Sequence, residues 1–207
     1  AIHALKLAKY ICDTTPSSNV LIVDVELCTL HFQKDYTADN AGSSLLFGDG
    51  AATVLVSNYI KTNKSISIDG FYGEVAFKGK KDMAWQLSSK GFLMTLSGYV
   101  PKLIEEDIDM LVQHALKQYG LNKEEITHWC IHPGGKKILQ VVEKQLALQP
   151  DDICHSLQIL KQYGNMSSPT ILFVLKSMMD KIINPARIFG LAFGPGLTME
   201  TFSASIR

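Results

Sequence analysis

The spacing of apolar residues changes from a helical to a strand period within the first quarter of the chain. The first helix is predicted by an apolar stripe at three- and four-residue spacing, formed by Ile2, Leu5, Ala8 and Cys12. The apolar and β-branched run at 19–26 predicts a strand that is buried on both faces. The polar segment 33–40 predicts a loop, and residues 43–50 lead through a glycine turn into a strand over 51–57.

A longer series of elements follows a linker at about residues 58–64. Residues 65–77 alternate as a strand, residues 79–91 form a connection, and an amphipathic helix over 100–118 begins behind Pro101 and ends at Gly120. The remaining predictions are a strand at 127–131, helices at 136–146, 150–162 and 168–182, and strands at 186–193 and 198–205. The last two strands flank the turn 194–196 and are therefore expected to pair with each other.

The order helix, strand, turn, strand is predicted twice, over residues 1–57 and again over residues 168–206. We interpret this order as an internal structural repeat in an α/β protein. Residues 1–58 are then the end of an N-terminal half, and residues 59–207 are a complete C-terminal half. The first copy shows only the tail of the unit, so its front half is expected to precede Ala1.

Composition and charge narrow the class of protein. With 46% hydrophobic residues among 207, the chain can form a substantial core, and its 20 basic residues balance 20 acidic ones. No Lys/Arg run exceeds two residues, which disfavours a nucleic-acid partner, and no apolar stretch approaches the roughly 20 residues that span a bilayer. The four cysteines lack C-x-x-C spacing, which favours a reducing cytoplasm, and the histidine spacings predict no metal site.

Two short polar motifs carry the candidate chemistry. His132 belongs to the run Ile-His-Pro-Gly-Gly at 131–135, and Asn165 belongs to Tyr-Gly-Asn-Met-Ser-Ser at 163–168. A neutral imidazole and a carboxamide can donate hydrogen bonds to a thioester oxygen that becomes an enolate or an oxyanion. Each residue also has a structural interpretation on its own: His132 as a core histidine, and Asn165 as a turn or helix-cap residue. Their combination favours half of an acyl-transfer site.

These two motifs, with Leu-Phe-Gly-Asp-Gly-Ala-Ala at 46–52 and Gly-Pro-Gly-Leu-Thr-Met-Glu at 194–200, resemble the chalcone synthase-like type III polyketide synthases. The motifs occur in family order, and the resemblance covers nearly the whole chain. It implies a thiolase-type fold with layers α/β/α/β/α. It also implies decarboxylative Claisen condensation of malonyl-CoA units onto an acyl-CoA starter, without a bound cofactor, in a homodimer.

The resemblance assigns roles to individual residues. His132 matches the histidine that supports a cysteine thiolate, and Asn165 matches the asparagine that helps to hold the malonyl thioester during decarboxylation. Phe47, by itself a core aromatic residue, matches the phenylalanine between the coenzyme A tunnel and the reaction cavity. The loop that lines the tunnel in relatives corresponds to Gly134, Gly135 and Lys137. The positions that shape or gate the cavity correspond to Trp85, Met94 and Pro195, with His31 and Met83 nearby.

The nucleophilic cysteine of the family is not found among the 207 residues. By the spacing of the family's helix it is expected about three residues before Ala1, so the chain by itself is expected to be inactive. Cys130 lies two residues before His132, but a nucleophile within a strand is less plausible than one at a helix N-terminus. Two alternatives stay open: a ketoacyl synthase III-like acyltransferase that uses an acyl carrier protein, and a non-catalytic binding or dimerisation module.

Overall fold

A mixed β-sheet lies at the centre of the C-terminal two-thirds of the chain, with the strand order β3-β8-β7-β6. The computed structural model describes residues 1–60, 62, 64–89 and 91–206, including all of their side chains except those of residues 38, 39, 85, 86, 92, 94 and 96. The strands are β3 (Ile66–Val75), β6 (His128–Ile131), β7 (Ala186–Gly194) and β8 (Thr198–Ile206). β8 pairs antiparallel with both β3 and β7, whereas β6 is parallel to β7.

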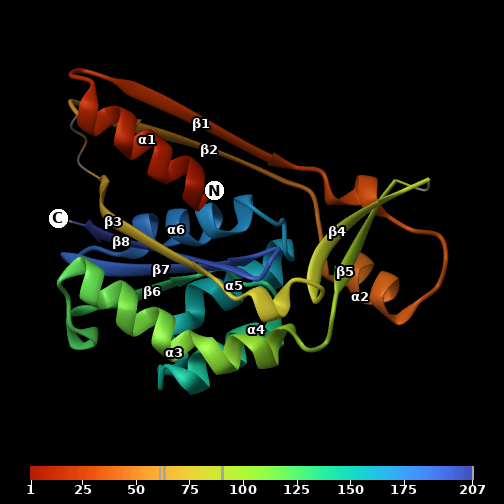
Figure 1. Ribbon diagram of the computed structural model, residues 1–207. Coiled ribbons are helices and arrows are strands. Elements are labelled where there is room, and N and C mark those ends of the chain that lie inside the picture. The colour runs from red at the N-terminus through yellow and green to blue at the C-terminus, as the bar shows by residue number, and fades with distance from the viewer. Residues whose placement is uncertain (61, 63, 90, 207) are drawn as a thin grey trace.

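Helices cover both faces of this sheet, and a two-stranded ribbon forms a further layer (Figure 1). α3 (Val100–Tyr119) and α4 (Lys136–Gln145) lie on one face, and α6 (Pro169–Lys181) and α1 (Ile2–Thr14) lie on the other. α5 (Cys154–Tyr163) contacts β6 and α6. Beyond α1 and α6, the strands β1 (Asn19–Glu26) and β2 (Gly50–Ser57) pair antiparallel. The described residues thus build successive helix, sheet, helix and sheet layers.

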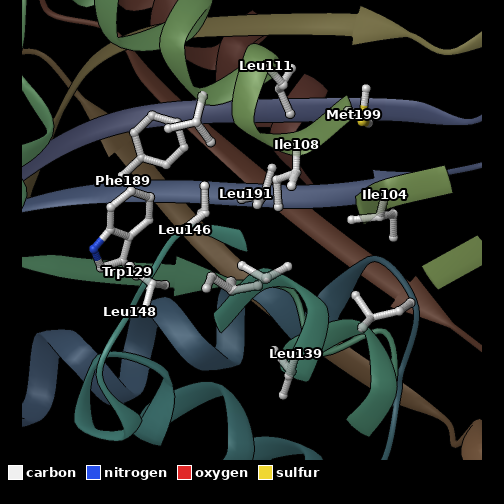
Figure 2. Close-up of a cluster of buried hydrophobic side chains, with 14 of the residues drawn as sticks. Ile104, Ile108, Leu111, Trp129, Leu139, Leu146, Leu148, Phe189, Leu191 and Met199 are labelled. Atoms are coloured by element: carbon white, nitrogen blue, oxygen red, sulfur yellow. The ribbon is translucent and has the colours of Figure 1, made fainter. Parts of the chain in front are cut away.

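The first core lies between the sheet and the helices α3 and α4, where the apolar side of each helix packs against the apolar side chains of one sheet face (Figure 2). Trp129 and Phe189 point into it from neighbouring strands, with ring centroids 5.1 Å apart. Ile104, Ile108 and Leu111 approach from α3 and are fully buried. Burial of each such side chain contributes about 1.5–3 kcal/mol before the entropy cost of ordering it.

The second core fills the opposite face of the sheet, between α1, α6 and the ribbon. Cys130 and Ile188 alternate with the residues of the first core and therefore point to this side. Gly190 is required by close packing, because a Cβ atom there would lie 2.0 Å from the ring of Phe202. Both faces of the sheet are therefore closely packed.

Most predicted elements are confirmed to within a few residues. The helix and the two strands of the predicted repeat occur twice, as α1, β1 and β2 and as α6, β7 and β8, but residues 38–46 form an additional helix between β1 and β2. β7 pairs with β8 as expected. α3 ends where predicted, at Gly120 in the left-handed conformation with φ of 66°. Short 3-10 turns at Cys28–His31, Phe77–Gly79, Lys123–Glu125 and Pro150–Ile153 join the elements.

Three expectations were wrong. β1 is buried on one face only: Leu21 and Val23 are each 63% exposed, because among the described residues α1 and α6 cover one side of the ribbon alone. The segment predicted to be a loop and a glycine turn contains α2 (Ala38–Leu46), which Thr37 caps by accepting a hydrogen bond from the Asn40 amide. The connection predicted at 79–91 contains a strand, β4 (Met83–Ser88), which pairs antiparallel with β5 (Gly91–Leu96).

Candidate active site

A cavity of about 370 Å³ lies at the end of the central sheet where β6 and β7 finish and where α1 and α6 begin. The two polar motifs meet there, although they are more than 30 residues apart in sequence. Its walls are formed by Ala1, Ile2, His3, Glu26, Phe47, Met83, Ala84, His132, Gly134, Ile138, Asn165, Ser167, Ser168, Ile171, Ala192, Phe193, Gly194, Pro195, Thr198 and Glu200. The lining contains ten apolar side chains, eight polar side chains and two glycines, so the cavity combines apolar walls with several groups that can form hydrogen bonds to a small organic substrate.

His132 leaves β6 directly after its last residue, and its backbone amide donates to the Leu191 carbonyl at 2.8 Å. The sheet therefore fixes the backbone from which the imidazole extends. Burial, with a smaller contribution from the positive charge of the Ala1 amino group, lowers the pKa of His132 to about 4. The ring is neutral at physiological pH, and among the described residues no group hydrogen-bonds it. A neutral imidazole that lines a cavity can donate one hydrogen bond to a substrate.

Asn165 follows a sharp turn at the end of α5. Gly164 has φ of 71°, and a Cβ atom there would lie 2.9 Å from the Leu46 carbonyl oxygen, so this position favours glycine. The Nδ2 atom of Asn165 donates a hydrogen bond to the Gly134 carbonyl at 3.2 Å. Its Oδ1 atom accepts a hydrogen bond from the Ser167 backbone amide at 2.8 Å. These two bonds orient the carboxamide and leave its second N–H for the cavity.

Phe47 reaches the cavity because two remote segments pair with each other. The Asn165 amide donates to the Leu46 carbonyl at 2.9 Å, and the Gly48 amide donates to the Asn165 carbonyl at 3.0 Å. This isolated parallel bridge joins residues 47 and 165 directly. The end of α2 is thereby held against the asparagine motif, and the Phe47 ring forms part of the cavity wall.

Only some of the remaining predicted site residues line the cavity. Gly134 and Pro195 line the cavity, whereas Gly135 and the exposed Lys137 lie at the start of α4, outside the lining. The backbones of Trp85 and Met94 pair across the β4–β5 hairpin, but their side chains lie outside the described part of the structure. Of the two neighbouring positions, Met83 lines the cavity and His31 does not.

Several cavity residues were not singled out from the sequence. Ser167 and Ser168 belong to the asparagine motif, and Glu200 ends the Gly-Pro-Gly motif, so the motif boundaries were an available signal. His3 lies on α1, and its Nε2 is 2.9 Å from Glu200 Oε1. No sequence signal marked His3, because it joins the site only when α1 packs beside β8.

Cys130 is excluded as a nucleophile for this cavity. Its side chain is fully buried in the second core, where Sγ lies 3.8 Å from the Ile171 carbonyl. Burial raises the pKa of this thiol, so the thiolate is disfavoured. None of the four cysteines lines the cavity. Within the described residues, no group of three or more His, Cys, Asp or Glu side chains is arranged to hold a metal ion.

Comparisons with known proteins agree with the fold. Residues 73–206 match the family model of chalcone and stilbene synthases, C-terminal domain, and residues 1–71 match 3-oxoacyl-[acyl-carrier-protein] synthase III. A putative chalcone synthase of Bacillus subtilis is 33% identical over 207 aligned residues, which cover 94% of this chain and 56% of that protein. The chain therefore spans about half the length of this curated relative.

Two solved structures have the same architecture. The type III polyketide synthase domain of Steely1, a type I/III hybrid from Dictyostelium, superposes with a TM-score of 0.91 at 25% identity, over 98% of this chain and 58% of that one. PKS-I from the brown alga Ectocarpus siliculosus superposes with a TM-score of 0.86 at 23% identity, over 98% and 56%. Because the sequence identity to PKS-I is only 23%, this second similarity shows a shared fold and nothing about function.

The layered α/β architecture is the thiolase-type fold of the type III polyketide synthases. More specifically, the chain belongs to the chalcone and stilbene synthase family, whose C-terminal domain it contains. None of the described helices is both long enough and apolar enough to cross a membrane.

Proposed function

We propose that this chain forms the oxyanion-binding part of an acyltransferase that condenses malonyl-CoA units onto an acyl-CoA starter. The observation that carries the proposal is the meeting of a neutral His132 and an oriented Asn165 at one cavity. In the proposed reaction, the bond between the malonyl carboxylate and its α-carbon breaks and releases carbon dioxide. The resulting enolate attacks the starter thioester, and the thiolate that held the starter leaves.

The two donors act on the oxygen of the malonyl thioester as it gains negative charge. Loss of one such donor costs about 2.7–4 kcal/mol of transition-state stabilisation in comparable oxyanion sites. A donor that is already neutral and already oriented needs no reorganisation during the reaction. The apolar wall, which includes Phe47 and Phe193, favours release of neutral carbon dioxide over retention of the carboxylate.

The proposal needs a thiolate that accepts the starter acyl group. We place it on the N-terminal side of α1, in a part of a full-length family member that these 207 residues do not contain. Ala1 and Ile2 line the cavity, so a residue just before α1 would face His132, and a helix N-terminus lowers the pKa of a nearby thiol. His132 would then stabilise the thiolate, as the resemblance implies.

We further propose that Gly134, Gly135 and Lys137 border the path of coenzyme A, because they join His132 to the start of α4. Residues 1–58 would end the N-terminal half and residues 59–207 would form the C-terminal half. Residues 1–71 and 73–206 match different family models, and the change from one model to the other falls within β3, after the proposed boundary. We also propose that the full-length protein is a homodimer and uses no bound cofactor. A location in the cytoplasm is proposed as well, because the four cysteines are free, as expected in a reducing compartment.

The decisive experiment separates starter loading from malonyl decarboxylation in the full-length protein. Asn165→Ala is expected to lower malonyl-CoA decarboxylation by 10²–10³-fold, while transfer of a radiolabelled starter to the protein stays within a few-fold of normal. Asn184→Ala is the matched control, because Asn184 is exposed and follows the C-terminal end of α6, whereas the cavity lies at the N-terminal end of that helix. An equal loss of loading and decarboxylation in Asn165→Ala would contradict the assigned role.

The match of residues 1–71 to 3-oxoacyl-[acyl-carrier-protein] synthase III favours a second candidate, which extends substrates on an acyl carrier protein. The two candidates differ in their extender substrate. Turnover with free malonyl-CoA supports the type III synthase, and turnover only with malonyl-acyl carrier protein supports the second candidate. A full-length protein that uses neither, but still associates, would support a binding or dimerisation module.

A further inference from the structure

The carboxylate of Asp24 lies on the inward face of β1, between the second core and the candidate active site along the strand. Val20 and Ile22 precede it on this face and pack in the second core, and Glu26 follows it and lines the cavity. The Asp24 side chain is only 13% exposed. A carboxylate removed from water is costly unless it receives hydrogen bonds, so its partners indicate what it does.

The hydrogen-bond partner of Asp24 is Ser168, which connects it to the beginnings of two helices. The Ser168 hydroxyl donates a hydrogen bond to Asp24 Oδ2 at 2.8 Å, although the two residues are 144 positions apart in sequence. The same hydroxyl oxygen accepts a hydrogen bond from the nitrogen of Ala1, which lies 3.6 Å from Asp24 Oδ2. These contacts form a chain from β1 through the beginning of α6 to the beginning of α1.

Ser168 does not use its hydroxyl for its own helix. It is the N-cap residue of α6, a position at which serine ordinarily accepts a hydrogen bond from an amide of the same helix, but within the described chain its side chain makes no such bond. The residue before α1 is Ala1, whose methyl group cannot cap a helix. The serine that begins α6 therefore accepts a hydrogen bond at the start of α1 instead.

The turn that carries Ser168 also carries Asn165. Ser167, which lies between them, has φ of 58°, in the left-handed region that residues other than glycine seldom adopt. Its amide donates a hydrogen bond to Asn165 Oδ1 at 2.8 Å. Strain of this kind persists only where surrounding contacts hold it, and it is concentrated at functional sites. One strained turn thus directs both the carboxamide of Asn165 and the hydroxyl of Ser168.

We infer that Asp24 and Ser168 are positioning residues for the nucleophile that the proposed function places before α1, and the inference rests on that function. A thiol about three residues before Ala1, at the N-terminus of the extended helix, makes Ala1 the third helical residue, whose amide has no partner within the helix. In the longer chain the nitrogen of Ala1 is a peptide amide that keeps one hydrogen for Ser168. Asp24 fixes the direction of this acceptor by accepting the hydrogen of the serine hydroxyl.

This hydrogen-bond chain holds the thiol at a fixed distance from the oxyanion donors. Ala1 lines the same cavity as His132 and Asn165. Ser168 joins the helix that follows the thiol to the turn that carries Asn165. A displacement of about 1 Å between reacting groups can lower a rate by about 100-fold, so loss of the chain should slow acyl transfer.

Transfer of a radiolabelled acyl-CoA starter to the full-length protein tests the inference. Ser168→Ala and Asp24→Ala should each lower the maximal rate of transfer by roughly 10–100-fold, with the KM for the starter within a few-fold of normal. Ser168→Thr keeps the hydroxyl and Asp24→Asn keeps an acceptor, so both should transfer the starter at nearly the normal rate. The double alanine variant should be no slower than the slower single variant, because the two residues act through one chain of hydrogen bonds.

Asp13→Ala on α1 and Ser177→Ala on α6 are the matched controls. Their side chains pair with other residues and neither residue lines the cavity, so both variants should transfer the starter normally. If Ser168→Ala does not fold, the comparison of Asp24→Ala with Asp24→Asn gives the same test.

Alkylation by iodoacetamide at pH 7 tests the position of the thiol without any substrate. In Ser168→Ala the thiol before α1 should react about tenfold more slowly, because a thiol displaced from His132 and from the helix N-terminus forms less thiolate. Mass spectrometry of the alkylated peptides distinguishes this thiol from the exposed Cys154.

The outcomes separate the inference from the proposed function. A full-length protein that transfers no starter, but whose thiol is alkylated more slowly in Ser168→Ala, contradicts the proposed function and supports the positioning role. Normal transfer and normal alkylation in Ser168→Ala, even with a lower melting temperature, overturn the inference. Effects of Asp24→Ala and Ser168→Ala that multiply in the double variant overturn it as well.

Discussion

Replacement of His132 by glutamine should change how the stability of the protein depends on pH. Burial lowers the pKa of this imidazole from its ordinary 6.5 to about 4, so the folded protein binds the proton less readily than the unfolded chain does. Protonation therefore favours unfolding. The destabilisation is negligible above pH 6.5, grows as the pH falls below that value, and levels off below about 4.

The magnitude follows from the difference between the two pKa values. At about 1.36 kcal/mol for each pKa unit, the folded state has lost about 3 kcal/mol of stability once the imidazole is protonated in both states, below about pH 4. At pH 5 the expected loss is about 2 kcal/mol. His132→Gln cannot take up this proton and should escape the loss. The variant should therefore gain about 2 kcal/mol relative to the natural protein between pH 7 and pH 5.

Urea unfolding followed by circular dichroism at several pH values measures this gain. The other titrating groups are common to both proteins and cancel in the difference between the two free energies of unfolding. His155→Gln is a useful comparison: its ring is only half-buried, burial also lowers its pKa, and a smaller gain is expected. Parallel stability curves for His132→Gln and the natural protein would refute the reasoning that the ring is buried and neutral.

Two further predictions concern the packing of the sheet and the cysteines. Gly190→Ala should destabilise the protein by about 1–3 kcal/mol in urea unfolding, because its Cβ would overlap the Phe202 ring. Gly42→Ala, where nothing lies within 4 Å, should be neutral or stabilising by up to about 1 kcal/mol, and equal losses in both variants would contradict the packing argument. In thiol titration of the folded protein, the exposed Cys154 should react before the buried Cys130, and the reverse order would place Cys130 at an accessible surface.

The sequence predicted the candidate site better than it predicted the surroundings of that site. His132 directly follows a predicted apolar strand and precedes two glycines, and Asn165 follows a predicted amphipathic helix and one glycine. Both residues could therefore be located from the local sequence pattern alone. α2 was missed because its residues Ala38–Leu46 include polar and small side chains without a clear helical stripe. The hairpin of β4 and β5 was missed because short strands with weak alternation resemble a connection. Both elements are held by contacts with remote segments that local pattern does not encode.

By itself the sequence determined most of the helices and strands, the division between their apolar and polar faces, and the four motifs that resemble the family. These properties depend on neighbouring residues, which set backbone preference and side-chain periodicity. Only the tertiary structure decided that Phe47 pairs with Asn165 across 118 positions, that His132 is buried and therefore neutral, and that Cys130 points away from the cavity. Those outcomes depend on which surfaces pack together, because burial and hydrogen-bond geometry arise from the whole folded chain.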